Sequence, residues 1–294
     1  MKLTYFSSKE SNFGDELNAV MWQGLIEPDY FDDNAEELFL GIGSIIWDKY
    51  PDSAKKIVVG SGYGGYTQVP NVKDGSWDFC FVRGPRTAKA LGIDAKLAIT
   101  DAAILTHYLN LPKQEKKHKV SFMPHFKSIV RGNWQQTCQQ AGIHFIDPRD
   151  DVESILREIQ ASEVLLTEAM HGAILADTLR TPWIAMEPIL AKHRSKWFDW
   201  SESMELDLAF RPTPSSSLLD WHAHKTAKQL GRTVTKILGK TFSVSNQAFI
   251  NKSAEQLVDT AKLPAQLSKE SVFQIKAEQA LAALATMPNI KLKV

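Results

Sequence analysis

The chain has 294 residues, of which 44% are hydrophobic and 23% charged, and its 34 basic and 34 acidic residues give a formal net charge of zero. This composition is typical of a globular protein with one large or two ordinary domains. It argues against a general nucleic-acid binder, which is normally basic, and an anionic substrate would need a local cluster of cations.

Short apolar runs alternate with helical patterns over the first 112 residues, which is typical of βα units around a mainly parallel sheet. Strands are predicted at residues 3–6, 37–40, 57–59, 79–82 and 97–99, and helices at residues 15–25, 44–49 and 86–91. Gly92 is a natural stop for the last of these helices.

Residues 111–118, LPKQEKKH, are polar and charged and contain a proline. This pattern predicts a linker between two domains, and the alternative is a surface loop within one domain.

A second alternating series follows the linker. Strands are predicted at residues 120–123, 144–146, 164–166 and 183–186, and helices at residues 134–141, 151–160 and 169–179. Asp151 is a candidate N-cap for its helix. Two consecutive series of this kind predict an α/β protein with two Rossmann-like domains that face a cleft.

The domains are predicted at residues 1–112 and 119–240, followed by a C-terminal helical tail at residues 241–294. Helices are expected at residues 218–238, 246–261 and 268–287. The last has an approximate amphipathic stripe, whose ordinary meaning is packing against the body of the protein. An interface or membrane-surface role is the alternative. We expect a C-terminal helix to cross back to the first domain.

The most informative stretch, residues 164–177, predicts a buried strand, a cap and a helix with a histidine in its first turn. Thr167 is a candidate cap, and Glu168 lies three residues before His171, so that the two side chains would share a helix face. A carboxylate at that place would favour the imidazolium form, a proton donor. Gly172 would let a ligand approach the backbone. The alternative is a hydrogen-bonded histidine without chemistry.

The first βα junction of the chain is a second candidate site, since ligands bind at such junctions. Asn12, Gly14 and Asp15 lie there, and helix capping is the alternative role. After the second strand, Gly43 and Ser44 belong to a GIGS sequence whose backbone N–H groups can approach a phosphate or sugar. The sequence lacks the third glycine of a dinucleotide fingerprint and the lysine of a P-loop.

Further polar residues follow other predicted strands. Arg83 is expected to project into the cleft, where a guanidinium binds carboxylate or phosphate in a fork, whereas Arg86 is expected to form a surface salt bridge. Asp101 would orient a substrate hydroxyl or cap a helix. His125 and Lys127 open the second domain at a strand end and suit an anionic ligand.

The densest basic cluster is residues 192–197, KHRSKW, after the strand at residues 183–186. Arg194 and Lys196 are its candidate anion ligands, although exposed charge runs are usually solvated. Trp197 and Trp200 flank it. The loop at residues 60–66 offers Tyr63 or Tyr66 for stacking on a sugar ring, with a purely structural loop as the alternative.

Only two cysteines, Cys80 and Cys138, are present, and they lack paired spacing. We therefore expect no disulfide framework and no zinc site, and a reducing cytosol is the simplest location. No secretory signal is visible, and no apolar run approaches the ~20 residues that span a bilayer.

Residues 168–177, EAMHGAILAD, followed by LRTPW at residues 179–183, resemble the core motif of the polysaccharide pyruvyltransferases, closest to the bacterial branch that decorates exopolysaccharide repeat units. The resemblance extends to NFGD at residues 12–15, GIGS at residues 41–44 and VRGPRT at residues 82–87. Most of the superfamily has Arg-Leu where this chain has Ala169-Met170. Another cation must therefore bind the anion in this chain, and we expect the basic cluster at residues 192–197 to supply it.

The resemblance implies a fold similar to the two-domain GT-B type of many glycosyltransferases. It also implies transfer of a 1-carboxyvinyl unit from phosphoenolpyruvate to two hydroxyls of one sugar, giving a pyruvate ketal and phosphate. Phosphoenolpyruvate is the donor substrate, and no cofactor is expected. The acceptor would be a lipid-linked glycan, with the protein in the cytoplasm and in contact with the inner membrane or polysaccharide assembly proteins.

For this chemistry, His171 held by Glu168 is the candidate acid, and Asp15 or Asp101 the candidate proton acceptor. The candidate cations for the donor are Arg83, His125, Arg194 and Lys196. Two alternatives remain open. One is a GT-B-type nucleotide-sugar glycosyltransferase, and the other is a non-catalytic carbohydrate-binding protein of polysaccharide assembly, whose tryptophans would stack on sugars.

Overall fold

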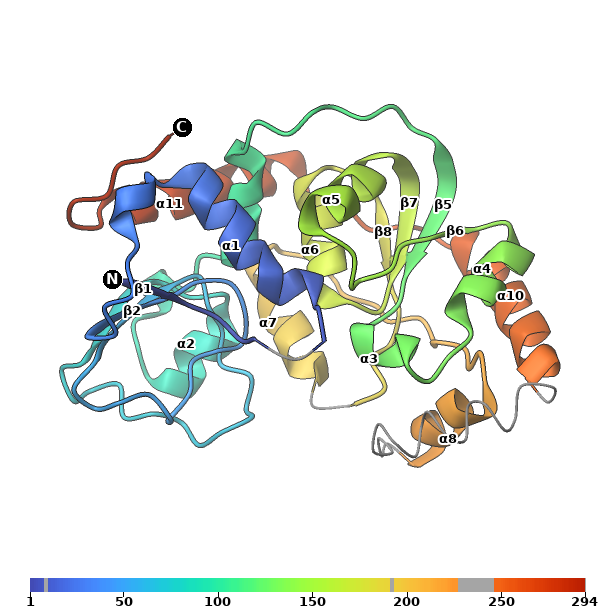
Figure 1. The fold of residues 1–294 in the computed structure, drawn as a ribbon, viewed down its shortest axis with the longest axis horizontal. Helices are drawn as coiled ribbons and strands as arrows, with labels where there is room; N and C mark the ends of the chain where they lie inside the picture. The colour runs from blue at the N-terminus through green and yellow to red at the C-terminus, as the bar shows by residue number, and fades with distance from the viewer. Residues whose placement is uncertain (8–9, 191–192, 227–245, 294) are drawn as a thin grey trace.

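The structure is a computed structural model that describes residues 1–7, 10–190, 193–226 and 246–293. Its described part contains two four-stranded sheets in which all pairings are parallel, with the orders β1-β2-β3-β4 and β6-β5-β7-β8 (Figure 1). The predicted α/β class is confirmed. We refer to the parts of the chain around these sheets as the first half and the second half.

The first sheet runs in chain order. Its strands are β1 (Lys2–Thr4), β2 (Glu37–Leu40), β3 (Lys55–Val59) and β4 (Trp77–Phe81). Helix α1 (Phe13–Leu25) connects β1 to β2, and α2 (Pro85–Leu91) follows β4 and ends at Gly92 in a left-handed conformation, as expected. This sheet shows no reversal of strand order, so the Rossmann-like description of the first half stays a prediction.

Two predicted elements of the first half are wrong. Residues 44–49 form a loop instead of a helix, and within it the Trp47 side chain donates from Nε1 to the carbonyl of Ser44. Residues 97–99 do not form a strand. Asp94 accepts the N–H of Lys96 and thereby starts the 3₁₀ helix η2 (Ala95–Leu97), so that only an isolated bridge to the first sheet remains.

The second sheet matches the predicted elements closely. Its strands are β5 (His118–Met123), β6 (His144–Phe145), β7 (Ser162–Thr167) and β8 (Trp183–Ala185), and its helices are α4 (Trp134–Ala141), α5 (Val152–Gln160) and α6 (Met170–Thr178). Asp151 caps α5 by accepting the N–H of Ser154 at 2.9 Å, as predicted. The strand order reverses between β5 and β7, and ligands of open α/β sheets bind outside the strand ends at such a reversal.

One of the three hydrophobic clusters of the described chain extends through both halves. Phe13 and Leu17 of α1 belong to the same buried cluster as Phe39 of the first sheet and Leu165 and Ile174 of the second half. Helix α1 lies between the first sheet and helices α5 and α6, and the chain crosses from one half to the other in an arch of residues 109–117 (Figure 1). The predicted domain boundaries stay a prediction.

Shorter elements complete the described part of the two halves. They are η1 (Pro28–Tyr30), η3 (Ala102–Tyr108) and α3 (Phe126–Ile129). Helix α7 (Arg194–Ser203), which was not predicted, packs against α2 of the first half although it follows the second sheet. It therefore brings residues of the second half against the end of β4.

The C-terminal helices are α8 (Leu218–Thr226), α10 (Gln247–Ala261) and α11 (Glu270–Ala285). Helix α11 returns to the first half, as expected, where the Ala283 carbonyl accepts from Cys80 at 3.1 Å (Figure 1). Residues 227–238 of the predicted helix and residues 241–245 of the predicted tail lie outside the described residues. Within the described part of the chain, no helix has the length and apolar character needed to cross a membrane.

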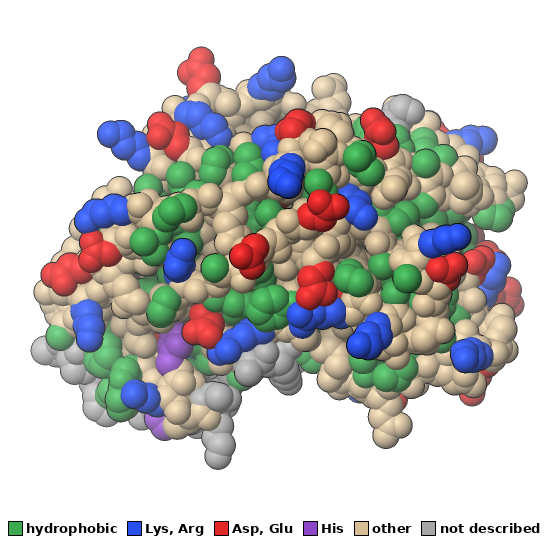
Figure 2. Space-filling view, turned by 180° about the vertical axis from the view of Figure 1, so that it is seen from behind, with side chains coloured by type: hydrophobic (Ala, Val, Ile, Leu, Met, Phe, Trp, Pro, Cys, Tyr) green, Lys and Arg blue, Asp and Glu red, His purple; other side chains and the backbone are tan. Residues whose placement is uncertain are grey.

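The visible rear surface carries basic and acidic side chains interspersed with one another, without a large patch of one sign (Figure 2). This distribution agrees with the zero net charge of the chain. An anionic ligand would have to be attracted by a local arrangement of cations.

Candidate functional site

A pocket of about 520 Å³ opens between the carboxyl ends of the strands of the two sheets. The loops after β1, β2 and β3 form one side, and the segments after β5, β7 and β8 form the other. The predicted site residues that line it are Asn12, Asp15, Gly43, Ser44, His125, His171 and Lys196. The tertiary structure thus brings together residues that are far apart in the sequence.

His171 is the second residue of α6, so its predicted place in the first turn is confirmed. Its side chain is 12% exposed, and its Nε2 lies 4.0 Å from Oδ2 of the buried Asp101. Neither of these two atoms has a hydrogen-bond partner among the described residues. The Nδ1 side of the ring lies over Gly14, where an added β-carbon would stand 2.0 Å from Nδ1. The imidazole is therefore enclosed between the two halves.

The expected pairing of Glu168 with His171 is wrong. Glu168 precedes α6, and its buried Oε2 accepts the backbone N–H of His125 at 3.0 Å and the hydroxyl of Ser128 at 2.6 Å. Because Glu168 is not in the helix, the spacing argument for a shared helix face does not apply. The carboxylate holds the segment after β5 and acts on the position of His125. Thr167 accepts the N–H of Ala169 at 3.0 Å, just before the helix.

The expected imidazolium is also contradicted. Burial lowers the pKa of His171 to about 3, and the positive charges of Lys196 and Arg83 act in the same direction. His171 is therefore neutral in the unliganded protein at neutral pH. Its nearest acidic group, Asp101, has a pKa that burial raises to about 6.

Asp15 is the carboxylate that lines the pocket. Burial raises the pKa of Asp15 to about 6, against the opposing effects of a hydrogen bond from Asn12 and the charge of Lys196. Nδ2 of Asn12 donates to Oδ2 of Asp15 at 2.5 Å, so Asn12 holds the carboxylate instead of capping α1 with its side chain. Gly43 passes close by with a φ of 127°, where an added β-carbon would lie 3.9 Å from Asp15 Oδ1. A carboxyl group with this pKa can exchange protons near neutral pH.

Four basic side chains line one end of the pocket, which we name the cationic end: His125, Lys127, His193 and Lys196. Burial lowers the pKa of Lys196 to about 8, with Arg83 adding to the effect and Asp15 opposing it. Burial also lowers the pKa of His125 well below its usual value. Its Nδ1 accepts the N–H of Lys127 at 3.3 Å, so the neutral ring carries its proton on Nε2 and remains a donor. His193 belonged to the predicted basic cluster but was not selected as a ligand.

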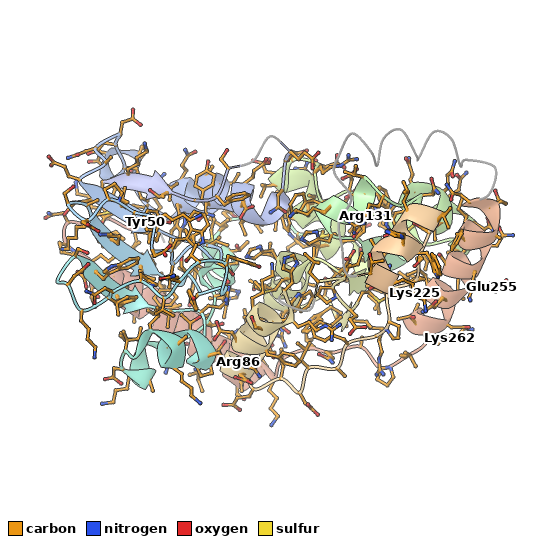
Figure 3. The ribbon with its side chains drawn as sticks, turned by 90° about the horizontal axis from the view of Figure 1, so that it is seen from below. Tyr50, Arg86, Arg131, Lys225, Glu255 and Lys262 are labelled. Atoms are coloured by element: carbon orange, nitrogen blue, oxygen red, sulfur yellow. The ribbon has the colours of Figure 1, made fainter. Side chains whose placement is uncertain are left out.

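Arg83 does not project into the pocket, which differs from the expectation. It is fully buried, with Nε 3.0 Å from Oδ2 of Asp199 on α7 and Nη1 donating to the hydroxyl of Ser44 at 2.7 Å. Arg83 thus acts on the pocket through Ser44 and its charge. Arg86 forms the expected surface salt bridge, to Glu202 at 2.6 Å, at the outer edge of the molecule (Figure 3).

Two other candidate residues also differ from the expectation. Arg194 does not line the pocket, and its Nη2 lies 2.7 Å from Oε1 of the partly exposed Glu187. At Gly172 an added β-carbon would stand 2.6 Å from the hydroxyl of Thr167, so this glycine permits helix–strand packing and not ligand approach. Lys192 of the basic cluster lies outside the described residues.

The aromatic residues of the pocket are not those that flank the basic cluster. Trp197 and Trp200 are buried against Trp183 and cannot stack on a sugar. Phe6, Trp47 and Tyr66 line the pocket instead, together with Phe126. Of these, only Tyr66 was considered from the sequence, because its loop follows a predicted strand. Trp47 lies in the segment wrongly predicted as a helix.

Comparison with known proteins adds two findings. Residues 12–188 match the family model described as polysaccharide pyruvyl transferase, a span that contains most of the pocket. The chain is also 36% identical over 222 residues to the succinoglycan biosynthesis protein ExoV of Rhizobium meliloti (strain 1021). That alignment covers 74% of this chain and 69% of the relative.

Proposed function

This chain belongs to the polysaccharide pyruvyl transferase family, and on that premise we propose that it transfers the enolpyruvyl unit of phosphoenolpyruvate to two hydroxyls of one sugar in an exopolysaccharide repeat unit. The products would be a pyruvate ketal and phosphate. The observation that carries the proposal is the pocket itself, in which a cationic end lies opposite a carboxyl group with a pKa of about 6.

The donor substrate fits the cationic end by charge. Phosphoenolpyruvate has a carboxylate and a phosphate, and both are bound best by several hydrogen-bonding cations. Lys196 and Lys127 supply ammonium groups, and His125 presents its Nε2–H. These groups come from the second half, where the strand order reverses and where a ligand of an open α/β sheet is expected. They would take over the anion-binding role of the Arg that most of the superfamily has where this chain has Ala169-Met170.

The pKa values support a division of roles that is the reverse of the one expected from the sequence. The negative charges of the donor would raise the pKa of Asp15 above about 6 and favour its protonated form. Asp15 then gives its proton to the methylene carbon of the enol phosphate, which becomes a methyl group as an oxocarbenium-like centre forms. The neutral His171 accepts the proton of the attacking hydroxyl, and the carboxylate of Asp101, 4.0 Å behind Nε2, stabilises the resulting imidazolium.

The remaining steps balance the reaction. The C–O bond to phosphate breaks, and His171 returns its proton to the departing phosphate. The second hydroxyl attacks the same carbon and closes the ketal, and its proton restores Asp15. Two C–O bonds, one C–H bond and one O–H bond form, while the C=C π bond, one C–O bond and two sugar O–H bonds break. No oxidant, reductant or further cofactor takes part in the proposed sequence.

The proposal also includes a GT-B-like architecture and a location at the inner membrane. Two parallel sheets with a pocket between their strand ends support a GT-B-like arrangement of donor and acceptor. A lipid-linked acceptor would place the reaction at the cytoplasmic face of the inner membrane.

The proposal is tested by incubating the full chain with phosphoenolpyruvate and a panel of lipid-linked and synthetic sugar acceptors. We expect phosphate release that depends on one class of acceptor, with a product heavier by one carboxyethylidene group. The same acceptors with nucleotide sugars in place of phosphoenolpyruvate serve as the control. Transfer from a nucleotide sugar, or no acceptor-dependent phosphate release, would overturn the proposal.

A further inference from the structure

The two halves line the pocket with largely different side chains, although Lys49 adds a basic group on the first-half side. The cationic end comes from the segments after β5 and β8 and from α7, whereas the opposite side comes from the ends of three consecutive strands of the first sheet. Phe6 follows β1, Trp47 lies in the loop after β2, and Tyr66 lies in the loop after β3. We name these three residues the aromatic wall.

The aromatic wall is unusual in its exposure. Phe6 is 42% and Tyr66 40% exposed, and among the described residues Trp221 is the other aromatic side chain with comparable exposure. Large apolar side chains normally lose about 1.5–3 kcal/mol of burial free energy when they remain in water. Two exposed rings that line one pocket therefore indicate a surface for a ligand.

Trp47 is held in a fixed orientation beside Phe6. Its ring is stacked on Tyr50 at 5.9 Å and meets Phe6 edge-on at 6.2 Å, and its Nε1 donates to the carbonyl of Ser44 at 2.9 Å. Tyr50, labelled in Figure 3, donates its hydroxyl to the carbonyl of Ile45 at 2.8 Å. The loop after β2 thus presents a preorganised ring to the pocket, which lowers the cost of binding a ligand.

The aromatic wall meets the cationic end at the edge-on pair of Tyr66 and His193, whose ring centroids are 6.0 Å apart. An anion held at the cationic end would therefore have the aromatic wall as its neighbour. Polar groups on the first-half side, Asn12, Ser44 and Thr67, lie in the same pocket. Apolar rings bordered by hydroxyl and amide groups match a pyranose, which has an apolar C–H face and a rim of hydroxyls.

We infer that the aromatic wall is the subsite for the pyranose ring that receives the pyruvyl group, with Phe6 and Tyr66 against the sugar face and the donor held at the cationic end. This inference rests on the proposed function, and it makes ring stacking a determinant of the acceptor. An open-chain polyol has the same hydroxyl groups without a rigid apolar face, so it should bind poorly.

The test measures binding of methyl glucoside, methyl galactoside and a linear hexitol to the full chain by saturation-transfer NMR, with and without phosphoenolpyruvate. The variants are Phe6→Ala, Tyr66→Ala and Phe6→Leu, the last of which keeps apolar bulk without an aromatic face. Trp221→Ala is the matched control, because Trp221 is an exposed aromatic residue that does not line the pocket.

We expect the signal from at least one glycoside to fall about three- to tenfold in each pocket variant and to stay unchanged in Trp221→Ala. The affinity of the two Phe6 variants for phosphoenolpyruvate, measured by calorimetry, should not change. Equal glycoside signals in all variants, or a hexitol signal as strong as those of the glycosides, would overturn the subsite. These readouts do not require turnover. Failure of the proposed function would appear separately, as a wild-type chain that releases no acceptor-dependent phosphate.

Discussion

A β-carbon on Gly14 would lie 2.0 Å from Nδ1 of His171, so the first turn of α1 touches the imidazole of the other half at a position where any larger residue would displace the ring. The two residues are 157 positions apart in the sequence, and their contact helps to align the loops that form the pocket. The glycine therefore serves the packing of the two halves around a site residue.

Gly14→Ala should displace the ring of His171 and destabilise the protein by about 1–3 kcal/mol, the usual cost of overpacking. Adding His171→Ala removes the clashing ring, so the double variant should recover most of the lost free energy of unfolding without recovering turnover. Urea unfolding of the four members of this cycle measures the coupling. Additive losses would mean that the two residues do not share the space.

Asp15→Asn should lower turnover by about 10²- to 10⁴-fold, the usual contribution of a general acid. In the wild type, kcat/KM should fall as the pH rises through about 6, because ionised Asp15 has no proton to donate. The kcat profile should fall at a higher pH, since the bound donor raises the pKa of Asp15.

The phosphate of the donor also titrates near pH 6. The fall in kcat/KM is therefore assigned by comparing the pH profiles of the wild type and Asp15→Asn. The profile of the variant should show only the ionisation of the donor. A wild-type kcat/KM that instead falls as the pH drops below about 6 would identify Asp15 as a base.

Lys196→Ala should weaken phosphoenolpyruvate binding by about 1.5–3 kcal/mol, the scale of a hydrogen bond to a charged group. Arg194→Ala is the matched control, because that guanidinium pairs with Glu187 outside the pocket lining and its loss should change donor affinity little. Calorimetric titration of both variants makes the comparison. If Arg194→Ala lowers the affinity for phosphoenolpyruvate as much as Lys196→Ala does, the donor does not bind at the cationic end as proposed.

Arg83→Ala should cost about 3–5 kcal/mol of unfolding free energy, because it leaves the buried carboxylate of Asp199 without its ion pair. Arg86→Ala, which breaks the exposed pair with Glu202, should cost less than about 1 kcal/mol. Denaturant unfolding of the two variants gives the difference directly. Similar losses in both would contradict a structural role for the Arg83–Asp199 pair.

Glu168→Gln should leave the pH dependence of turnover unchanged, since Glu168 contacts the His125 segment and not His171. Its amide oxygen can still accept hydrogen bonds from His125 and Ser128. Glu168→Ala cannot, and should raise the KM for phosphoenolpyruvate more than it lowers kcat as the His125 segment shifts. A displaced pH profile in Glu168→Gln would restore the pairing with His171 that the sequence suggested.

The sequence by itself determined the local features of this protein. Periodicity and capping residues located nearly all the strands and long helices of the described chain, because signals such as Asp151 and Gly92 act within a few residues. The rule that ligands bind at strand ends also placed Asn12, Asp15, His125 and His171 correctly along the pocket. The same rule could not tell which way a side chain at a strand end would turn.

Only the tertiary structure decided the partners of these side chains. Arg83 turns to Asp199 because α7, which the sequence did not reveal as a helix, packs against α2 and brings a carboxylate to the end of β4. Glu168 turns to His125 because β5 and β7 are neighbours in the sheet although 43 residues separate the two side chains along the chain. The pKa of His171 falls because the ring is buried against Gly14 of the first half and because Lys196 and Arg83, both remote in sequence, add positive charge. Such effects depend on distances of a few ångströms between segments remote in sequence, and short-range patterns carry no information about them.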